Sequence, residues 1–164
     1  MSTTSFAPLD ITPMWARVND DLIELLGLLP DDKLDWSPKP ELWNSKGILI
    51  HICFGRFGIM GLILQDGKPM PDIIGEGQTK EGLITLLRNS WQRMEPFLSN
   101  TDLLEREYTV PFRDLEPATF SGHWLAFGQL EHDVHHRADI YRYLGELGIA
   151  HMEPDSLERK ARDG

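Results

Sequence analysis

The segment Glu131-His132-Asp133-Val134-His135-His136-Arg137 lies inside a long helical stretch and decides how the rest of the chain is interpreted. Residues four positions apart in an α-helix lie about 40° apart around the axis and one turn along it. His132 and His136 therefore point the same way and can both reach one metal ion. His135 follows His132 by three residues and is a competing second ligand on spacing alone.

The helix face that carries His132 and His136 mixes polar and apolar residues, as the lining of a pocket does. Gln129, Asp139 and Tyr143 are its polar members, and we expect them to line a pocket beside the histidines. Asp139 lies one turn beyond His136. It either accepts a hydrogen bond that orients a ligand histidine or is simply solvated.

The opposite face of this helix is apolar as well. Its members are Phe127, Leu130, Val134 and Tyr141. A helix at the edge of a monomeric bundle needs only one apolar stripe. The second stripe therefore predicts a symmetric homodimer; the alternative is that both stripes are buried within one monomer.

Outward from this segment, apolar residues at helical spacing predict four long helices. The first begins with Thr12 as its N-cap and ends before Pro30; the second is capped by Asn44 or Ser45 and runs to about Gln65; the third opens at Thr79 and ends at Ser99; the fourth is capped by Thr119 and ends at Gly145 or Gly148.

These helices predict an all-α, four-helix bundle with a long connection between helices three and four. The connection covers residues 100–118, and an α+β domain that uses residues 105–113 as a strand is the weaker alternative. We expect one domain over residues 1–164, with a helical core at about 12–148 and a frayed, charged tail at 153–164.

His51 lies midway along the second helix and shares its face with Gly55 and Gly58. A glycine in a helix interior costs about 1 kcal/mol relative to alanine. These two leave space beside His51, either for a ligand or for the close approach of another helix. Zinc-like ions that act on substrates take three protein ligands and keep one open position, so His51 joins His132 and His136 as a candidate ligand. His123 lies about 180° around the helix from His132 and is excluded.

The composition excludes several functions. The net charge is −10, and 16 Lys and Arg are scattered among 26 Asp and Glu without a basic run, which argues against nucleic acid and anionic membranes as partners. The apolar stretch 47–64 contains His51, Arg56 and four glycines, which argues against a membrane span. Residues 1–9 lack the pattern of a signal peptide, so we expect a cytoplasmic protein.

Three segments of the sequence resemble the DinB/YfiT-like superfamily of metal-binding four-helix bundles. They are Leu29-Pro30-Asp31-Asp32-Lys33-Leu34-Asp35-Trp36-Ser37-Pro38, Trp43-Asn44-Ser45-Lys46-Gly47-Ile48-Leu49-Ile50-His51-Ile52 and Glu131-His132-Asp133-Val134-His135-His136-Arg137-Ala138-Asp139-Ile140. The superfamily often has Gly-Gln after its His-Arg pair, whereas this chain has Ala138-Asp139.

The resemblance implies one divalent transition metal on His51, His132 and His136, commonly in a dimer, and favours His136 over His135 as a ligand. Zinc or nickel is expected first and iron next, because all three suit imidazole ligands. Members of the superfamily include thiol-dependent transferases and isomerases that use mycothiol, bacillithiol or glutathione, and proteins described as metal-dependent hydrolases.

The function expected from the sequence is therefore that of a metal-dependent enzyme. It would act on a small molecule by thiol transfer or hydrolysis, with a low-molecular-weight thiol as a second cofactor in the first case. Two alternatives stay open, a metal-binding protein without catalysis and a metal-free helical dimerisation or interaction domain.

Overall fold

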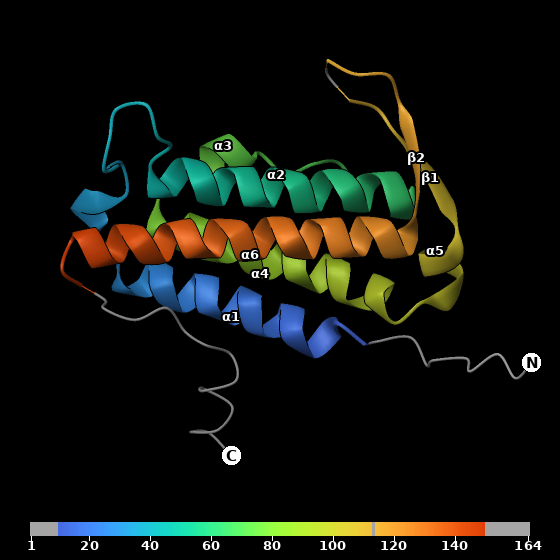
Figure 1. The fold of residues 1–164 in the computed structure, drawn as a ribbon, viewed down its shortest axis with the longest axis horizontal. Coiled ribbons are helices and arrows are strands. Elements are labelled where there is room, and N and C mark those ends of the chain that lie inside the picture. The colour runs from blue at the N-terminus through green and yellow to red at the C-terminus, as the bar shows by residue number, and fades with distance from the viewer. Residues whose placement is uncertain (1–9, 113, 150–164) are drawn as a thin grey trace, which may run out of the picture.

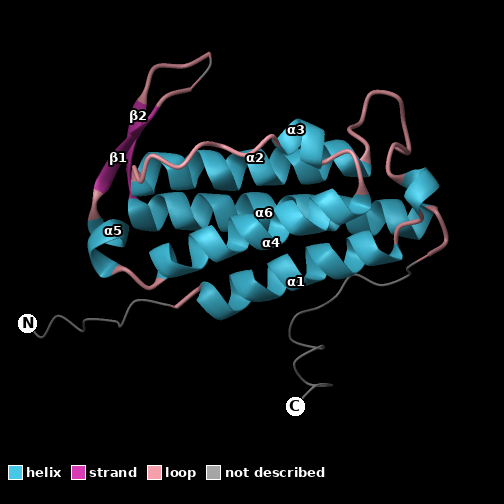
Figure 2. Ribbon diagram, turned by 180° about the vertical axis from the view of Figure 1, so that it is seen from behind, coloured by secondary structure: helices cyan, strands magenta, loops and turns pink. Residues whose placement is uncertain are grey.

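The structure is a computed structural model that describes residues 10–112 and 114–149, so the tail predicted at 153–164 lies outside the described residues. The elements are α1 (Thr12–Leu28), a 3₁₀ turn (Asp31–Lys33), α2 (Ser45–Leu64), α3 (Ile73–Glu76), α4 (Lys80–Leu98), α5 (Thr101–Glu105), β1 (Glu107–Val110), β2 (Ala118–Ser121) and α6 (Gly122–Glu146) (Figure 2). The long helices α1, α2, α4 and α6 form the predicted all-α, four-helix bundle.

Each long helix packs against two others. Both α1 and α2 lie against α4 and α6, so α1 and α2 are diagonal to each other (Figure 1). Helices α1 and α6 run in one direction and α2 and α4 in the other, as the colour gradient of Figure 1 shows. The antiparallel neighbours α2 and α6 bring the middle of each helix to the middle of the other.

The connection between α2 and α4 crosses the length of the bundle. Asp66, just after α2, pairs with Arg93 late in α4, with 2.7 Å between Oδ1 and Nη2. Gln78, just before α4, reaches Lys46 at the start of α2. The predicted long connection between α4 and α6 instead stays at one end, where it forms α5 and an antiparallel hairpin that pairs Thr109 with Thr119.

Two of the predicted helix starts are correct. Asn44 accepts a hydrogen bond from the Gly47 amide at 2.7 Å, and Thr79 accepts one from the Gly82 amide at 3.1 Å. Both side chains satisfy an amide that has no partner within its helix. Asn44 thereby fixes where the helix that carries His51 begins.

The other two predicted starts are wrong. Ile11 occupies the N-cap position of α1, because the Asp10 carboxylate already accepts the Thr12 amide at 2.9 Å. Thr119 belongs to β2, and its hydroxyl lies 3.2 Å from that of Thr109. Ser121 caps α6 instead by accepting from the Trp124 amide. The hairpin therefore delays the start of α6 by two residues.

Among the described residues, α2 alone has the length and apolar composition that would allow a membrane crossing. The structure gives another reason for that composition, because α2 packs against both α4 and α6. Arg56, in the middle of α2, has no exposed surface and is paired inside the bundle. Helix α2 is thus a core helix of the bundle.

The second apolar stripe of α6 is mostly accounted for within one chain. Leu130, Val134 and Tyr141 are partly buried and pack against the core, whereas Phe127 remains 47% exposed. The stripe is therefore covered mostly within one chain, which is the alternative stated above, and the homodimer stays a prediction. The side chains are covered because α6 touches both α1 and α2.

Candidate metal centre

Three histidines meet where the second turn of α2 faces the middle of α6. His51 comes from α2, and His132 and His136 come from successive turns of α6. One ring nitrogen of each lies within 4.8 Å of the others, and the Nε2 atoms of His51 and His132 are 2.8 Å apart. All three are half-buried. We call them the histidine triad; the structure brings together the three residues that the sequence proposed as ligands.

His135 does not join the triad. Its side chain is 71% exposed, and its Nε2 atom lies 3.6 Å from Asp139 Oδ2. Asp139 also lies 3.3 Å from Nδ1 of His136. His135, His136 and Asp139 thus form a second group with ligand atoms within 4.8 Å of one another. A proton on His136 Nδ1 that is donated to Asp139 leaves Nε2 of that ring with a free lone pair.

The three predicted pocket residues take different places. Asp139 and Tyr143 line one cavity together with His136, whereas Gln129 does not line it. The Tyr143 hydroxyl donates to the Trp43 carbonyl at 2.9 Å. Gln129 is buried and donates from Nε2 to Asp133 Oδ1 at 2.9 Å.

The space beside the glycines of α2 is used in two ways. A Cβ on Gly55 would lie 3.1 Å from Gln129 Oε1 and 3.2 Å from Nε2, so the absence of a side chain admits this amide. A Cβ on Gly58 would meet nothing within 4 Å. Close packing is therefore the reason for Gly55, and Gly58 faces outward.

Trp43 forms an aromatic wall beside the triad. Its ring centroid is 4.7 Å from that of His51 and 6.4 Å from that of His136, the latter nearly parallel at 19°. The cavity of about 550 Å³ lies on the His136 side, and a second hollow on the other side contains His51 and Phe54. Trp43 itself is 56% exposed, so a small molecule can approach the triad from either side of it.

Burial and mutual repulsion favour the neutral form of two of these imidazoles, His51 and His136. Desolvation lowers the pKa of His51 below its ordinary value, and the nearby His132 and His136 lower it further. Desolvation is also the main reason that the pKa of His136 is lowered, with His132 adding to it, although Asp139 acts in the opposite sense. Neutral imidazole is the form of histidine that binds metal ions.

The sequence analysis did not identify Asp133. This residue is fully buried, and its Oδ2 atom lies 2.8 Å from Arg56 Nε in α2. Arg56 Nη1 also donates to Asn19 Oδ1 of α1 at 2.7 Å and to Ser90 Oγ of α4 at 3.2 Å. We call Asn19, Arg56, Ser90 and Asp133 the buried polar cluster; each long helix contributes one member.

The electrostatics of this cluster keep Asp133 ionised. Burial alone would raise the pKa of its carboxyl group. Arg56 and hydrogen bonding with His132, Trp15 and Gln129 together outweigh that effect, so the pKa falls below its ordinary value. The one sequence signal was Arg56 itself, because a lone cation in an apolar helix requires a buried anion.

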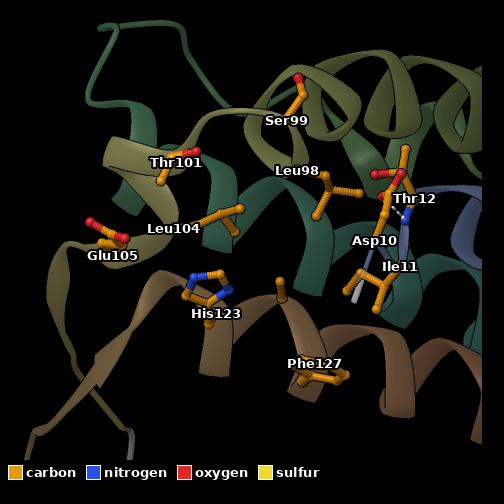
Figure 3. Close-up of a pocket in the computed structure, with 11 residues that line it drawn as sticks. Asp10, Ile11, Thr12, Leu98, Ser99, Thr101, Leu104, Glu105, His123 and Phe127 are labelled. Atoms are coloured by element: carbon orange, nitrogen blue, oxygen red, sulfur yellow. Dashed lines mark hydrogen bonds between the residues drawn. The ribbon is translucent and has the colours of Figure 1, made fainter. Parts of the chain in front are cut away.

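Two other candidates do not belong to the centre. Cys53 is fully buried, and desolvation raises the pKa of its thiol to about 12, which makes it a poor nucleophile at neutral pH. A cavity of about 250 Å³ lies at the hairpin end of the bundle, lined by Asp10, Glu105, His123 and Phe127 among others (Figure 3). Within the described residues, these acids and His123 form no group with metal-ligand spacing.

The fold and this site define a four-helix bundle with three histidines gathered between two antiparallel helices. Residues 14–140 match the sequence profile of the DinB superfamily, and the chain belongs to that superfamily. A comparison with curated protein sequences found no match.

Solved structures of two proteins share the fold. The DinB-like protein YjoA from Bacillus subtilis superposes with a TM-score of 0.65 at 16% identity, over 89% of this chain and 96% of that one. The mycothiol-dependent maleylpyruvate isomerase superposes with a TM-score of 0.62 at 17% identity, over 85% of this chain but only 63% of that one. At these identities the likeness concerns the fold.

Proposed function

We propose that this protein holds one divalent transition metal ion on His51, His132 and His136, and acts on a small molecule in the cytoplasm. The observation that carries the proposal is that one ring nitrogen from each of three histidines lies within 4.8 Å of the others. The three rings also lie against one another, with centroid separations of 4.6 to 5.1 Å. Here two Nε2 atoms lie 2.8 Å apart.

The residues present fit such an ion. Three imidazole nitrogens are the protein ligands of several catalytic zinc sites, and they also suit nickel and iron. His132 and His136 each have a carboxylate near Nδ1, from Asp133 at 3.3 Å and Asp139 at 3.3 Å. This arrangement leaves Nε2 available on both rings, as metal-binding histidines require.

A bound ion would supply Lewis acidity at an open coordination position. The chain itself would provide the rest of the site. Trp43 and Tyr143 offer aromatic surface, and Arg142 and Asp139 offer charges of both signs along the same cavity. Such a lining suits a small molecule that combines apolar and charged groups.

The reaction that we propose is thiol transfer or hydrolysis. A low-molecular-weight thiol would be the second cofactor in the first case, in line with the name of the mycothiol-dependent isomerase that shares the fold. The cavity beside His136 has room for a ligand of this kind, at about 550 Å³. Assays with such thiols and electrophilic acceptors, and with ester or amide substrates, separate the two reactions.

A homodimer is also part of the proposal, and the outer face of α2 supports it. Between Gly47 and Gln65 the only Lys, Arg, Asp or Glu is Arg56, which is buried. Phe54 is 38% exposed, and Gly58 and Gly61 next to it have open space beyond them. An uncharged face of this kind suits a second copy of the chain. Sedimentation equilibrium should show a dimer that Phe54→Lys weakens.

The metal is tested by elemental analysis of purified protein after incubation with zinc, nickel or iron. We expect one ion per wild-type chain and none in His132→Ala. His135→Ala is the matched control, because it removes an exposed histidine of the same helix that lies outside the triad. If the wild type stays metal-free, the chain is better explained as a helical interaction domain. If metal binds but every assay is silent, a role without catalysis is favoured.

A further inference from the structure

Asp133 lies at the boundary between the buried polar cluster and the histidine triad. Its Oδ2 atom accepts hydrogen bonds from Arg56 Nε and Trp15 Nε1, both at 2.8 Å. Its Oδ1 atom accepts one from Gln129 Nε2 at 2.9 Å and lies 3.3 Å from His132 Nδ1. An ionised carboxylate has about four acceptor positions. All four are filled if His132 carries its proton on Nδ1.

The other neutral tautomer of His132, with its proton on Nε2, also has a hydrogen-bond partner for Nδ1. Gln129 Nε2 also lies 3.1 Å from His132 Nδ1 and could donate to it. In that arrangement the lone pair of Nδ1 would face the ionised Oδ1 of Asp133 at 3.3 Å. A hydrogen bond to a charged acceptor is roughly twice as strong as one between neutral groups. The carboxylate therefore favours a proton on Nδ1.

The orientation of the Gln129 amide follows from the same charge. Its Nε2 atom is the one near Asp133 Oδ1, because an amide oxygen at 2.9 Å would be repelled by the carboxylate. Gly55 lets the amide occupy this position, since any Cβ there would press on it. Gln129 therefore donates to the Asp133 carboxylate. It does not take the place of Asp133 as the partner of His132 Nδ1.

We propose that Asp133 is a positioning residue that fixes the tautomer of His132, with the proton on Nδ1 and the lone pair of Nε2 directed at the triad. A second assignment follows, because Nε2 of His51 lies 2.8 Å from Nε2 of His132. Only one of these nitrogens can carry the shared proton, so without a metal it belongs to His51. His132 is then the preorganised ligand, and His51 is the one that must change tautomer when an ion binds.

The buried polar cluster holds Asp133 from all sides of the bundle. Arg56 reaches it from α2 and is itself tied to Asn19 in α1 and Ser90 in α4. Trp15 adds a bond from α1. The orientation of the half-buried His132 ring is thus set by Asp133 and by the buried residues that hold Asp133 in place. The consequence for metal affinity rests on the proposed function, whereas the tautomer does not.

The first test is a long-range ¹H–¹⁵N correlation spectrum of the full chain, labelled at histidine nitrogens and treated with chelator. The signal of His132 is identified by its loss in His132→Asn. We expect the pattern of a neutral ring protonated on Nδ1 for His132, and on Nε2 for His51. A His132 ring protonated on Nε2 overturns the proposal. This result is independent of whether any metal binds.

The second test compares zinc affinity, by chelator competition, in Asp133→Asn and Asp21→Asn. Asp21 is the matched control, because it is a similarly buried carboxylate, 2% exposed, that forms ion pairs with Arg17 and Arg137. We expect a loss of about tenfold to a hundredfold for Asp133→Asn and less than threefold for Asp21→Asn.

Equal losses in the two variants, or none in Asp133→Asn, overturn the positioning role. If Asp133→Asn does not fold, the tautomer of His132 in the wild-type spectrum is the test of the proposal. If wild-type protein binds no zinc, the proposed function fails, while the spectrum still tests Asp133.

Discussion

The histidine triad and the buried polar cluster are neighbours in the bundle, but they differ in exposure and in pairing. Every member of the cluster is at most 3% exposed, and a full positive and a full negative charge face each other at 2.8 Å. The triad is half-buried, and two of its Nε2 atoms, those of His51 and His132, face each other at 2.8 Å. The cluster pairs its charges within the protein, whereas the triad presents imidazole nitrogens to one another.

Polar groups in a helical core can therefore serve stability or binding, and their partners distinguish the two cases. Asp133 takes part in both, because one of its oxygens faces Arg56 and the other faces His132. Variants that affect only one cluster should separate the two roles.

The largest effect is expected for Arg56→Met, which leaves the Asp133 carboxylate buried without its cation. Removal of one partner of a buried ion pair typically costs about 3–5 kcal/mol. Urea denaturation followed by circular dichroism measures the loss. The double variant Arg56→Met/Asp133→Leu is the control and should regain most of it, because apolar residues can replace such a pair. A loss below about 1 kcal/mol in the single variant would mean that water already reaches the cluster.

The histidine triad should contribute to stability only through its ligand. Zinc at one hundred times its dissociation constant is expected to stabilise the wild type by about 2.7 kcal/mol. His51→Ala should lose this increment, because it removes the ligand that α2 contributes. Thermal unfolding with and without zinc measures the difference. His135→Ala should keep the full increment, and an increment retained by His51→Ala would exclude His51 as a ligand.

The comparison also shows which parts of the structure a single sequence can predict. Periodicity and caps predicted the four long helices and the starts at Asn44 and Thr79, because these signals are local. The starts at Thr12 and Thr119 were wrong, since Asp10 and the pairing of the hairpin compete for the same residues. A capping pattern in the sequence does not show that another residue or strand will take the same backbone or side-chain group.

The site was predictable to the same extent. The spacing of His132 and His136 is a property of one helix, and His51 was added from ligand number and from family resemblance. Asp133 was missed because a charged residue between histidines is usually solvated. Its partner Arg56 lies 77 positions away in the chain. Only the packing of α2 on α6 shows that the two meet.

A smaller effect is expected at the edge of the triad. Tyr143→Phe removes the hydroxyl that donates to the Trp43 carbonyl and ties the connector before α2 to α6. We expect the free energy of unfolding to fall by about 1 kcal/mol or less, since Trp43 is exposed and water can hydrogen-bond to its carbonyl instead. Limited proteolysis should show faster cleavage near Trp43. Tyr108→Phe is the control, because its hydroxyl donates to Leu103 far from the triad. Equal cleavage near Trp43 in both variants would contradict the role of Tyr143.

The smallest effects are expected from two glycines one turn apart on α2. Gly58→Ala should stabilise the monomer by about 0.5–1 kcal/mol, because within one chain its Cβ meets nothing within 4 Å and alanine is the better helix former. Gly55→Ala should lose that gain, since its Cβ would lie 3.1 Å from the Gln129 amide. Displacement of Gln129 also disturbs Asp133 and should lower zinc affinity a few-fold. Denaturation and chelator competition on both variants give the two readouts. If Gly55→Ala behaves like Gly58→Ala in both, the Gln129 amide has room to move, and the triad does not depend on it.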